Sequence, residues 1–112
     1  MFEEEVYEGE EFANIEAPET HIKKKKFENC EFIECNFSNC DFFGSQFIEC
    51  RWIECNLSNI SVAETSFQKA TFNECKLIGV DFQYCMNFLR SFAFHDCNLN
   101  FSSFYKLKIN KT

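Results

Sequence analysis

The sequence predicts an all-β solenoid, a chain that coils through short extended segments with about four corners in each turn. Three observations support this prediction. An apolar residue recurs at every fifth position, a period-of-two alternation restarts inside each five-residue unit, and the residue types are unusual for an ordinary core. Of 112 residues, 16 are Phe and 8 are Cys, so aromatic rings and thiols must supply the packing that Leu and Val supply elsewhere.

The five-residue repeat is unbroken from residue 22 to residue 82. Its central position is apolar in every unit, the position two residues earlier is small or β-branched except at Lys25, and the position between them is polar. Each unit therefore points a small and a large side chain inward and a polar one outward. We expect the core to contain Phe27, Phe32, Phe37, Phe42, Phe47, Trp52, Leu57, Phe67, Phe72, Leu77, Phe82, Cys30, Cys35, Cys40, Cys50, Cys55 and Cys75.

The restart of the alternation requires the chain to turn a corner in each unit. A straight strand would continue its period of two, and apolar residues five apart on an α-helix would be separated by about 140° and scatter around its circumference. Four corners close a square coil of about 20 residues, whose backbone pairs with the coils above and below at ~4.8 Å. Residues twenty apart then become stacked neighbours.

The N-terminal residues 1–21 are interpreted as an acidic cap. This segment keeps part of the repeat phase, but Glu5 and Glu10 occupy the small inward position. Regular coil is therefore not expected before Phe12 or Ile15. A cap is needed because the end of a solenoid exposes the edge of its last coil.

Residues 22–112 are predicted to form the solenoid, with one irregular corner or bulge at 83–91. The units beyond that corner lie two residues ahead of the first frame, so the corner must contain two extra residues. Only three residues follow Ile109, which leaves Phe104 and its neighbours without a capping segment. We expect a homodimer through this exposed C-terminal end, or a chain that is shortened from a longer solenoid.

Several units resemble the pentapeptide repeat proteins, whose consensus is a small residue, Asp or Asn, Leu or Phe, and two variable residues. The units with this pattern are Cys35-Asn36-Phe37, Cys40-Asp41-Phe42, Cys55-Asn56-Leu57, Val80-Asp81-Phe82 and Cys97-Asn98-Leu99. The resemblance implies a right-handed quadrilateral parallel β-helix of about four to five coils. It implies less about function, because the repeat encodes a shape.

The same resemblance suggests one specific function. Some proteins of that family protect bacterial type II topoisomerases from quinolones by presenting a rod with the shape and negative field of duplex DNA. The Phe and Cys usage here, with Tyr7, Phe12 and Phe27, is similar to that subgroup, although its members are about twice as long and use projecting loops.

The charge distribution weakens the DNA-mimic interpretation. Residues 1–20 contain eight Glu and no Lys or Arg, a charge of -8, whereas residues 21–112 contain ten acidic and eleven basic residues, a charge of +1. The acidity therefore lies in the cap, and the solenoid is nearly neutral. The first hypothesis is a non-catalytic scaffold for protein interaction, and the alternative is a DNA-mimicking modulator of DNA gyrase that gives quinolone protection.

All eight cysteines fall in the small inward position of the repeat. Stacked pairs such as Cys35 and Cys55 would carry parallel side chains, with Cβ atoms wider apart than a disulfide prefers, and thiols on different faces cannot converge on zinc. We expect buried free thiols, no metal and no cofactor. The acidic first residues do not resemble a secretory signal and no apolar stretch is long enough to span a membrane, so we expect a cytoplasmic protein without membrane contact.

Catalysis has little support in the sequence. Ser91, His95 and Asp96 could be combined into a nucleophile, a base and an orienting group, but the polar surface of a repeat supplies such triples by chance. We expect no enzymatic activity and no direct binding of nucleic acid.

The outward positions offer the candidates for partner binding. Glu34, Glu54 and Glu74 align at the coil spacing, either as an ordinary solvated face or as a binding strip. Phe43 projects outward and is expected to form an apolar patch with nearby isoleucines. Those isoleucines are Ile33, Ile48 and Ile53.

Overall fold

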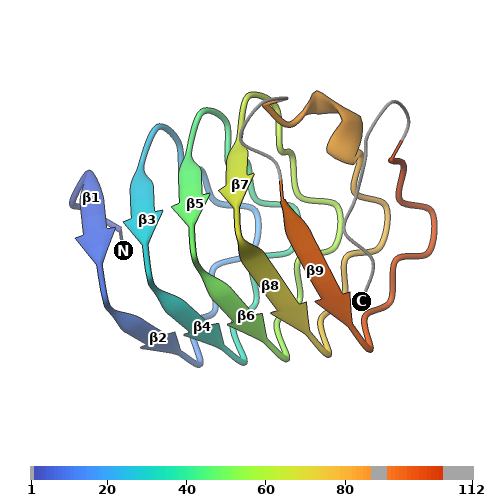
Figure 1. Ribbon diagram of the computed structural model, residues 1–112, viewed down its shortest axis with the longest axis horizontal. Coiled ribbons are helices and arrows are strands. Elements are labelled where there is room, and N and C mark those ends of the chain that lie inside the picture. The colour runs from blue at the N-terminus through green and yellow to red at the C-terminus, as the bar shows by residue number, and fades with distance from the viewer. Residues whose placement is uncertain (1, 87–90, 105–112) are drawn as a thin grey trace.

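Within residues 2–86 and 91–104, which the computed structural model describes, nine short strands form two parallel sheets (Figure 1). One sheet stacks four strands in the order β1, β3, β5 and β7, and the other stacks five in the order β2, β4, β6, β8 and β9. The strands are Val6–Glu8 (β1), Glu11–Ala13 (β2), Lys26–Glu28 (β3), Glu31–Ile33 (β4), Gln46–Ile48 (β5), Arg51–Ile53 (β6), Ser66–Gln68 (β7), Ala70–Asn73 (β8) and Phe92–His95 (β9).

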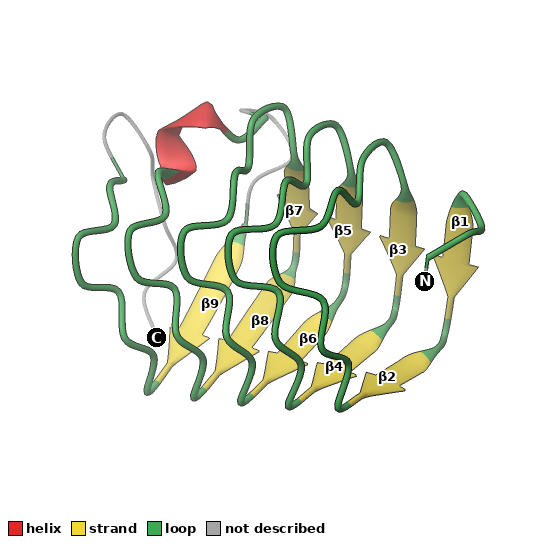
Figure 2. Cartoon of the chain, turned by 180° about the vertical axis from the view of Figure 1, so that it is seen from behind, coloured by secondary structure: helices red, strands yellow, loops and turns green. Residues whose placement is uncertain are grey.

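The other two sides of the coil consist of turns that single bridges join from coil to coil (Figure 2). Asn36 bridges to Asn56 on the third side, and Asp41 bridges to Ser61 on the fourth. A turn on the third side closes where the N–H of Cys40 donates to the carbonyl of Phe37 at 3.1 Å. Two strand sides and two turn sides make a quadrilateral parallel β-helix, which confirms the predicted fold class.

Coils stack in a register of twenty residues until the last one. Phe27 pairs with Phe47, for example, and the same offset holds through β8. β9 differs because Phe94 pairs with Phe72, an offset of 22 residues. The two extra residues follow a short 3-10 helix, η1 (Phe82–Tyr84), at the end of the fourth side.

The irregular corner expected at 83–91 includes residues 87–90, which lie outside the described part. After it, β9 begins with Phe92 in a small position, paired with Ala70 of β8. The ring of Phe92 reaches over the ring of Phe67, with centroids 5.4 Å apart, and both residues are buried. Phe92 therefore covers the part of the core that lies beside the irregular corner.

Regular pairing begins at Val6, earlier than the sequence interpretation placed it. β1 and β2 lie inside the segment assigned to a cap, yet they pair with β3 and β4 in the register of the later coils, and Tyr7 stacks on Phe27 with ring centroids 5.1 Å apart. Glu5 and Glu10 are compatible with coil because, in the first coil of the described residues, both side chains are exposed. Their backbone carbonyls still accept hydrogen bonds of 2.9 Å from the second coil.

The core is a stack of aromatic ladders. Phe27 lies parallel to Phe47 with centroids 5.0 Å apart, and Phe32 lies parallel to Trp52 at 4.1 Å, while Phe27 and Phe32 of adjacent sides meet edge to face. Each of the core residues expected from the repeat is buried. At the N-terminal end, the ring of Phe2 packs on the first coil and closes this interior.

Each corner is made by one residue in the left-handed backbone region. Every fifth residue from Gly9 to Gly79 has a φ between 53° and 72°, a region that favours Gly and tolerates Asn. Six of these fifteen corners are nevertheless occupied by Glu. The backbone of the coil therefore imposes this conformation even where the side chain opposes it.

The side chain in the small position also donates a hydrogen bond. The thiol of Cys50 donates to the carbonyl of Phe27 at 3.3 Å, and the hydroxyl of Thr65 donates to the carbonyl of Phe42 at 2.8 Å. Each of these bonds joins a small side chain to the central residue of the preceding coil. Cys, Ser and Thr fit the position because they are small and can donate a hydrogen bond.

Candidate interaction surfaces

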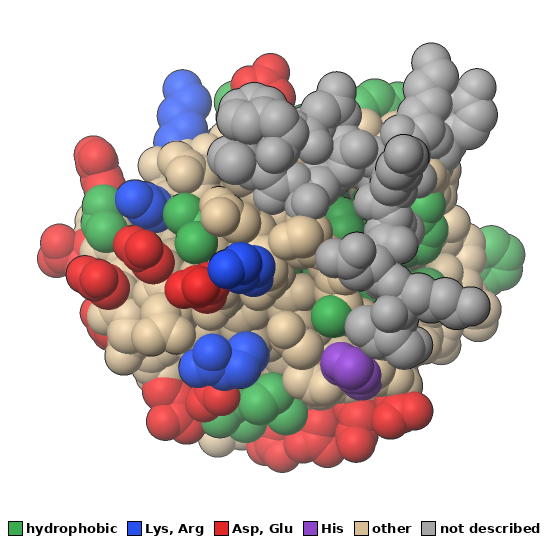
Figure 3. Space-filling view, viewed as in Figure 1, with side chains coloured by type: hydrophobic (Ala, Val, Ile, Leu, Met, Phe, Trp, Pro, Cys, Tyr) green, Lys and Arg blue, Asp and Glu red, His purple; other side chains and the backbone are tan. Residues whose placement is uncertain are grey.

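An acidic column lies at the corner where β4, β6 and β8 end. Glu34, Glu54 and Glu74 follow these strands directly, are exposed and stand in successive coils, and Asp96 continues the column after β9. In Figure 3, acidic side chains line the lower edge, where these strands end in Figure 1. The charges of Glu34 and Glu74 raise the pKa of Glu54, because a carboxylate between two carboxylates is harder to ionise.

Phe43 does not form an apolar patch with Ile33 and Ile53. Phe43 follows the bridge residue Asp41 on the fourth side, whereas Ile33 and Ile53 end strands on the second side. The correction follows from the coil itself, since residues ten apart lie on opposite sides of a square that turns every five residues. Phe43 is half-buried on the fourth side.

Two exposed aromatic residues were not identified from the sequence. Tyr84 is 61% exposed at the irregular corner, and Phe101 is 91% exposed at a corner with φ 62°. Phe101 takes the corner that Asn39, Asn59 and Gly79 occupy in earlier coils. The signal was available in the sequence, because the second frame places Phe101 two residues after the central Leu99, in the corner position.

The C-terminal end of the described solenoid is formed by Phe104. Its ring stacks on Phe82 with centroids 4.9 Å apart and remains half-buried. Ile109, the other residue predicted to form a dimer contact there, lies outside the described residues. The aromatic ladder of the fourth side therefore extends at least to Phe104.

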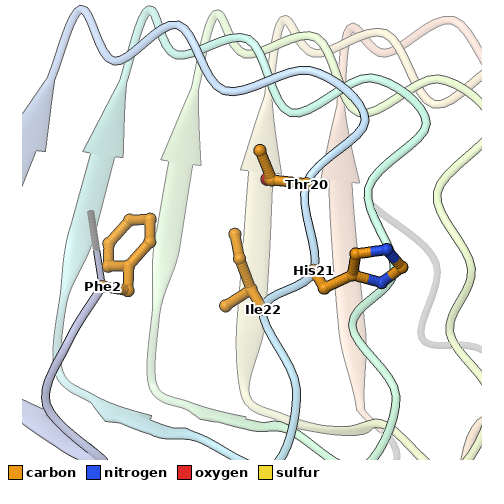
Figure 4. A pocket seen from close by; sticks show the side chains of 4 residues that line it. All are labelled: Phe2, Thr20, His21 and Ile22. Atoms are coloured by element: carbon orange, nitrogen blue, oxygen red, sulfur yellow. The ribbon is translucent and has the colours of Figure 1, made fainter.

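Two shallow hollows are present on the described residues. One, of about 200 Å³, is lined by Phe2, Thr20, His21 and Ile22 at the N-terminal end. Figure 4 shows Phe2 and Ile22 facing each other across it, while the imidazole of His21 points away. The other, of about 170 Å³, lies beside the junction of β8 with β9. In the second hollow, the hydroxyl of Ser91 is bound to the backbone N–H of Lys69.

The residues of the suggested catalytic triple have separate surroundings. The hydroxyl of Ser91 accepts a hydrogen bond from the backbone N–H of Lys69, which anchors the start of β9. His95 and Asp96 are both exposed, and Asp96 is a corner residue with φ 55°. Within the described residues, no hydrogen bond joins these three side chains, and no group of His, Cys, Asp and Glu has a metal-binding arrangement.

The repeat itself is matched by a known family. A model of pentapeptide repeats aligns with residues 27–71 in nine copies, inside the part of the chain where the twenty-residue register is regular. Residues 27–71 of this chain therefore consist of pentapeptide repeats. No curated protein matches the sequence.

Solved structures similar to this pentapeptide repeat protein include QnrB1, described as a plasmid-mediated fluoroquinolone resistance protein. Full-length QnrB1 aligns with 84% of this chain and 48% of its own, with 18% identity and a TM-score of 0.52. Two trypsin-treated QnrB1 variants align with 20% and 21% identity, TM-scores of 0.48 and 0.49, and coverage of 84% and 85% of this chain and 58% of each variant. The chain thus spans about half the length of these structures, and at this identity the likeness concerns the fold.

The cysteines of this chain occupy the small inward position of the repeat. Seven are buried, and Cys97 is half-buried in the last coil. Burial raises the pKa of Cys50 to about 12, which keeps the thiol protonated and able to donate to the preceding coil. No helix in the described part of the chain has the length and apolar character needed to cross a bilayer.

Proposed function

We propose that this pentapeptide repeat protein is a non-catalytic scaffold that binds a protein partner on the outside of its solenoid. The observation that carries the proposal is the use of the inward positions, whose rings and small side chains are buried against one another. The two hollows described above are small, about 200 and 170 Å³. What differs from coil to coil is the outer surface, and partner recognition belongs there.

The candidate contacts are of two kinds. The acidic column offers three exposed carboxylates at a fixed spacing, which suits a basic partner, while apolar residues near the fourth side and the C-terminal end offer smaller anchors. The proposed contact residues are Glu34, Glu54, Glu74, Phe43, Phe104 and Ile109.

The experiment compares two triple variants in affinity capture from the host. Glu34→Gln, Glu54→Gln and Glu74→Gln together remove the column, and Glu11→Gln, Glu49→Gln and Glu64→Gln remove the same charge from other corners and strands. A protein retained by wild type and by the control variant, and lost with the column variant, is the expected result. Equal capture by all three proteins, or turnover of a substrate by the purified chain, would overturn the proposal.

A second candidate is modulation of bacterial DNA gyrase. It is favoured by the shared fold with full-length QnrB1 and by the acidic column. It is opposed by the nearly neutral solenoid and by the shorter length. Purified protein is added to a gyrase supercoiling assay with and without a fluoroquinolone. Protection that is lost in the column variant supports this function, and no change in supercoiling at any protein concentration rejects it.

We also propose a cytoplasmic location and self-association. Buried cysteines that form no disulfide, such as Cys50 and Cys55, fit a reducing compartment. A homodimer through the C-terminal end would cover Phe104 and its ladder. Sedimentation at several concentrations measures the association, and a strict monomer would contradict it.

A further inference from the structure

The outer face of the five-stranded sheet carries an apolar strip. Ile33 ends β4 and Ile53 ends β6, and the two residues are paired neighbours in successive coils. Ala13 of β2 continues the strip, paired with Ile33. Both isoleucines are half-buried, and no helix or strand of the described residues lies over this face (Figures 1 and 2). In Figure 3, apolar side chains adjoin the acidic lower edge. The strip is a surface that a partner can cover.

The two flanks of this strip differ in charge. On one flank, Arg51 Nε lies 3.1 Å from Glu31 Oε2, so that side is nearly neutral. On the other flank lies the acidic column, and the ion pairs found among the described residues involve none of Glu34, Glu54 and Glu74. A partner that covers the strip is therefore expected to bring cations to one side only.

The solenoid does not require acidic residues at this corner. Asn14 makes the same corner in the first coil, and the corner that follows β1, β3, β5 and β7 mixes neutral and charged residues. Glu is also less suited than Asn or Gly to the left-handed backbone region, and the charges of Glu34 and Glu74 raise the pKa of Glu54. The column therefore opposes stability in two ways, which favours a role in binding. The residues of the mixed corner are Gly9, Asn29, Glu49 and Lys69.

The spacing of the column suits a helix better than an extended chain. Successive coils are about 4.8 Å apart, so three carboxylates span about 10 Å. Residues i, i+3 and i+7 of an α-helix rise by about 4.5 and 10.5 Å along its axis, which keeps each within about 1 Å of a carboxylate level. Alternate residues of an extended chain advance by about 6.6 Å, so the third side chain would be more than about 3 Å out of step.

The same face is hollowed at the end nearer β9. Thr71 of β8 and Ala93 of β9 occupy the positions that Glu31 and Arg51 hold in earlier coils. These shorter side chains line the hollow of about 170 Å³ at the junction of the two strands. A hollow beside an apolar strip can seat one bulky apolar side chain of a partner.

We propose that this sheet face binds a basic amphipathic helix of a protein partner. The helix lies along the stack and crosses β4, β6 and β8. Its apolar stripe covers Ile33 and Ile53, its Lys or Arg side chains meet the acidic column, and one bulky side chain enters the hollow. The inference deepens the proposed scaffold function and rests on it, because it states the kind of partner that the column recognises.

The first test measures binding of a labelled model peptide to the full chain by fluorescence anisotropy. The peptide has Lys at i, i+3, i+7 and i+10 with Leu on the neighbouring stripe, and the control peptide has the same composition with Lys and Leu alternating. The helical peptide should bind at least about tenfold more tightly than the control, and salt should weaken its binding. Circular dichroism should show the peptide gaining helix in the complex. Equal binding of the two peptides, or no binding of the helical one, would overturn the proposal.

The second test locates the helical peptide on the protein. The column variant should bind it at least about tenfold more weakly than wild type does. A control triple variant removes the same charge from the three other corners and should bind within about twofold of wild type. An equal loss in both variants would indicate attraction to overall charge and reject the site. The control changes are Glu19→Gln, Glu49→Gln and Glu64→Gln.

The third test concerns the apolar strip. Ile53→Asn introduces the residue type that Asn73 supplies at the paired position of the next coil, so the coil should tolerate the change. It should weaken binding of the helical peptide at least about fivefold. Ile48→Asn is the control, because Ile48 is also half-buried but ends β5 in the other sheet. With both variants folded by circular dichroism, equal affinities would show that the helix does not contact the strip.

Failure of this inference is distinguishable from failure of the scaffold function. Affinity capture that depends on the column, together with a helical peptide that does not bind, would reject the helix and leave the scaffold function in place. Capture that is equal for wild type and the column variant would reject the scaffold function as proposed, whatever the peptide does.

Discussion

The ring of Phe92 covers the ring of Phe67, with centroids 5.4 Å apart, although the backbone position of Phe92 belongs to a small side chain. Replacing Phe92 with Ala should lower the free energy of unfolding by about 3 to 5 kcal/mol, because the void beside the irregular corner cannot collapse. Urea denaturation measures the change. Phe101→Ala removes the same atoms from a 91% exposed position and should cost little. Equal losses in the two variants would contradict the packing role of Phe92.

The corners at Gly79 and Gly9 should differ in their tolerance of a methyl group. Both have positive φ, 72° and 65°, so Ala at either should cost about 1 kcal/mol in backbone strain. A Cβ at Gly79 would also lie 2.5 Å from the Oδ1 atom of Asn59, whereas nothing lies within 4 Å of a Cβ at Gly9. The side chain of Asn59 is exposed and can turn away, so Gly79→Ala should destabilise more than Gly9→Ala by less than about 1 kcal/mol. Thermal unfolding of the two variants compares them, and a smaller loss at Gly79 would refute the expectation.

Phe101→Asn should stabilise the fold. Phe101 holds a left-handed corner with φ 62°, where Asn39 and Asn59 stand in earlier coils, and it buries almost none of its ring. Asn adopts that backbone region more readily, which is worth about 1 kcal/mol. The measurement is the midpoint of urea denaturation. A lower midpoint for Phe101→Asn would contradict this expectation and would mean that the exposed ring of Phe101 stabilises the fold.

The acidic column should make stability depend on pH. The charges of Glu34 and Glu74 raise the pKa of Glu54, so the folded protein takes up a proton there at a higher pH than the unfolded chain does. The contribution of Glu54 to stability is therefore lost as pH rises through that pKa and regained on acidification. Glu54→Gln should become more stable relative to wild type as pH rises through the raised pKa of Glu54, and high salt should reduce the difference.

The control for the acidic column is Glu64→Gln. Glu64 occupies a corner where Gly44 stands in the preceding coil, so no carboxylate is stacked on it from that side. The pH dependence of its stability relative to wild type should be smaller than that of Glu54→Gln. The same pH dependence in both variants would show that overall charge, and not the column, is responsible.

The buried thiols should resist modification in the folded protein. Burial raises the pKa of Cys50 to about 12, and its thiol donates to the carbonyl of Phe27. Iodoacetamide at neutral pH should label the half-buried Cys97 first and Cys50 only on unfolding. Mass spectrometry of the peptides follows the order. Rapid labelling of Cys50 in native conditions, or a disulfide after denaturation without reductant, would contradict a protonated, unpaired thiol.

The sequence was sufficient for the coil because a five-residue period excludes both regular alternatives. Phe27, Phe47 and Phe67 stand one above the other, as residues twenty apart must when four corners close a turn. The two-residue advance of the second frame likewise corresponds to the pairing of Phe94 with Phe72. Periodicity fixes which residues face the same side, and that information survives without coordinates.

The sequence was less informative where the role of a repeat position depends on which coil the residue belongs to. Glu10 seemed unfit for the small position, but in the first coil that position is open to solvent. Phe43 and Ile33 were grouped from their similar chemistry, although ten residues place them on opposite sides. The repeat frame places Phe92 in a small position, but it does not predict that the Phe92 ring packs on Phe67, because that contact depends on the path of the irregular corner. The solvent exposure of a position and the path of an irregular corner depend on the three-dimensional structure, so the repeat pattern alone does not predict them.

The twenty-residue register also limits how such a chain can change length. Loss or gain of one five-residue unit would turn everything downstream by a quarter of the coil, so Glu74 would leave the side that Glu34 and Glu54 share. A whole coil can be added or removed without this rotation. Two extra residues before β9 are tolerated because one corner absorbs them, and Asp96 still follows Glu74 on the same side. The architecture therefore permits growth in full turns and local loops, while the outward pattern that a partner would recognise stays aligned.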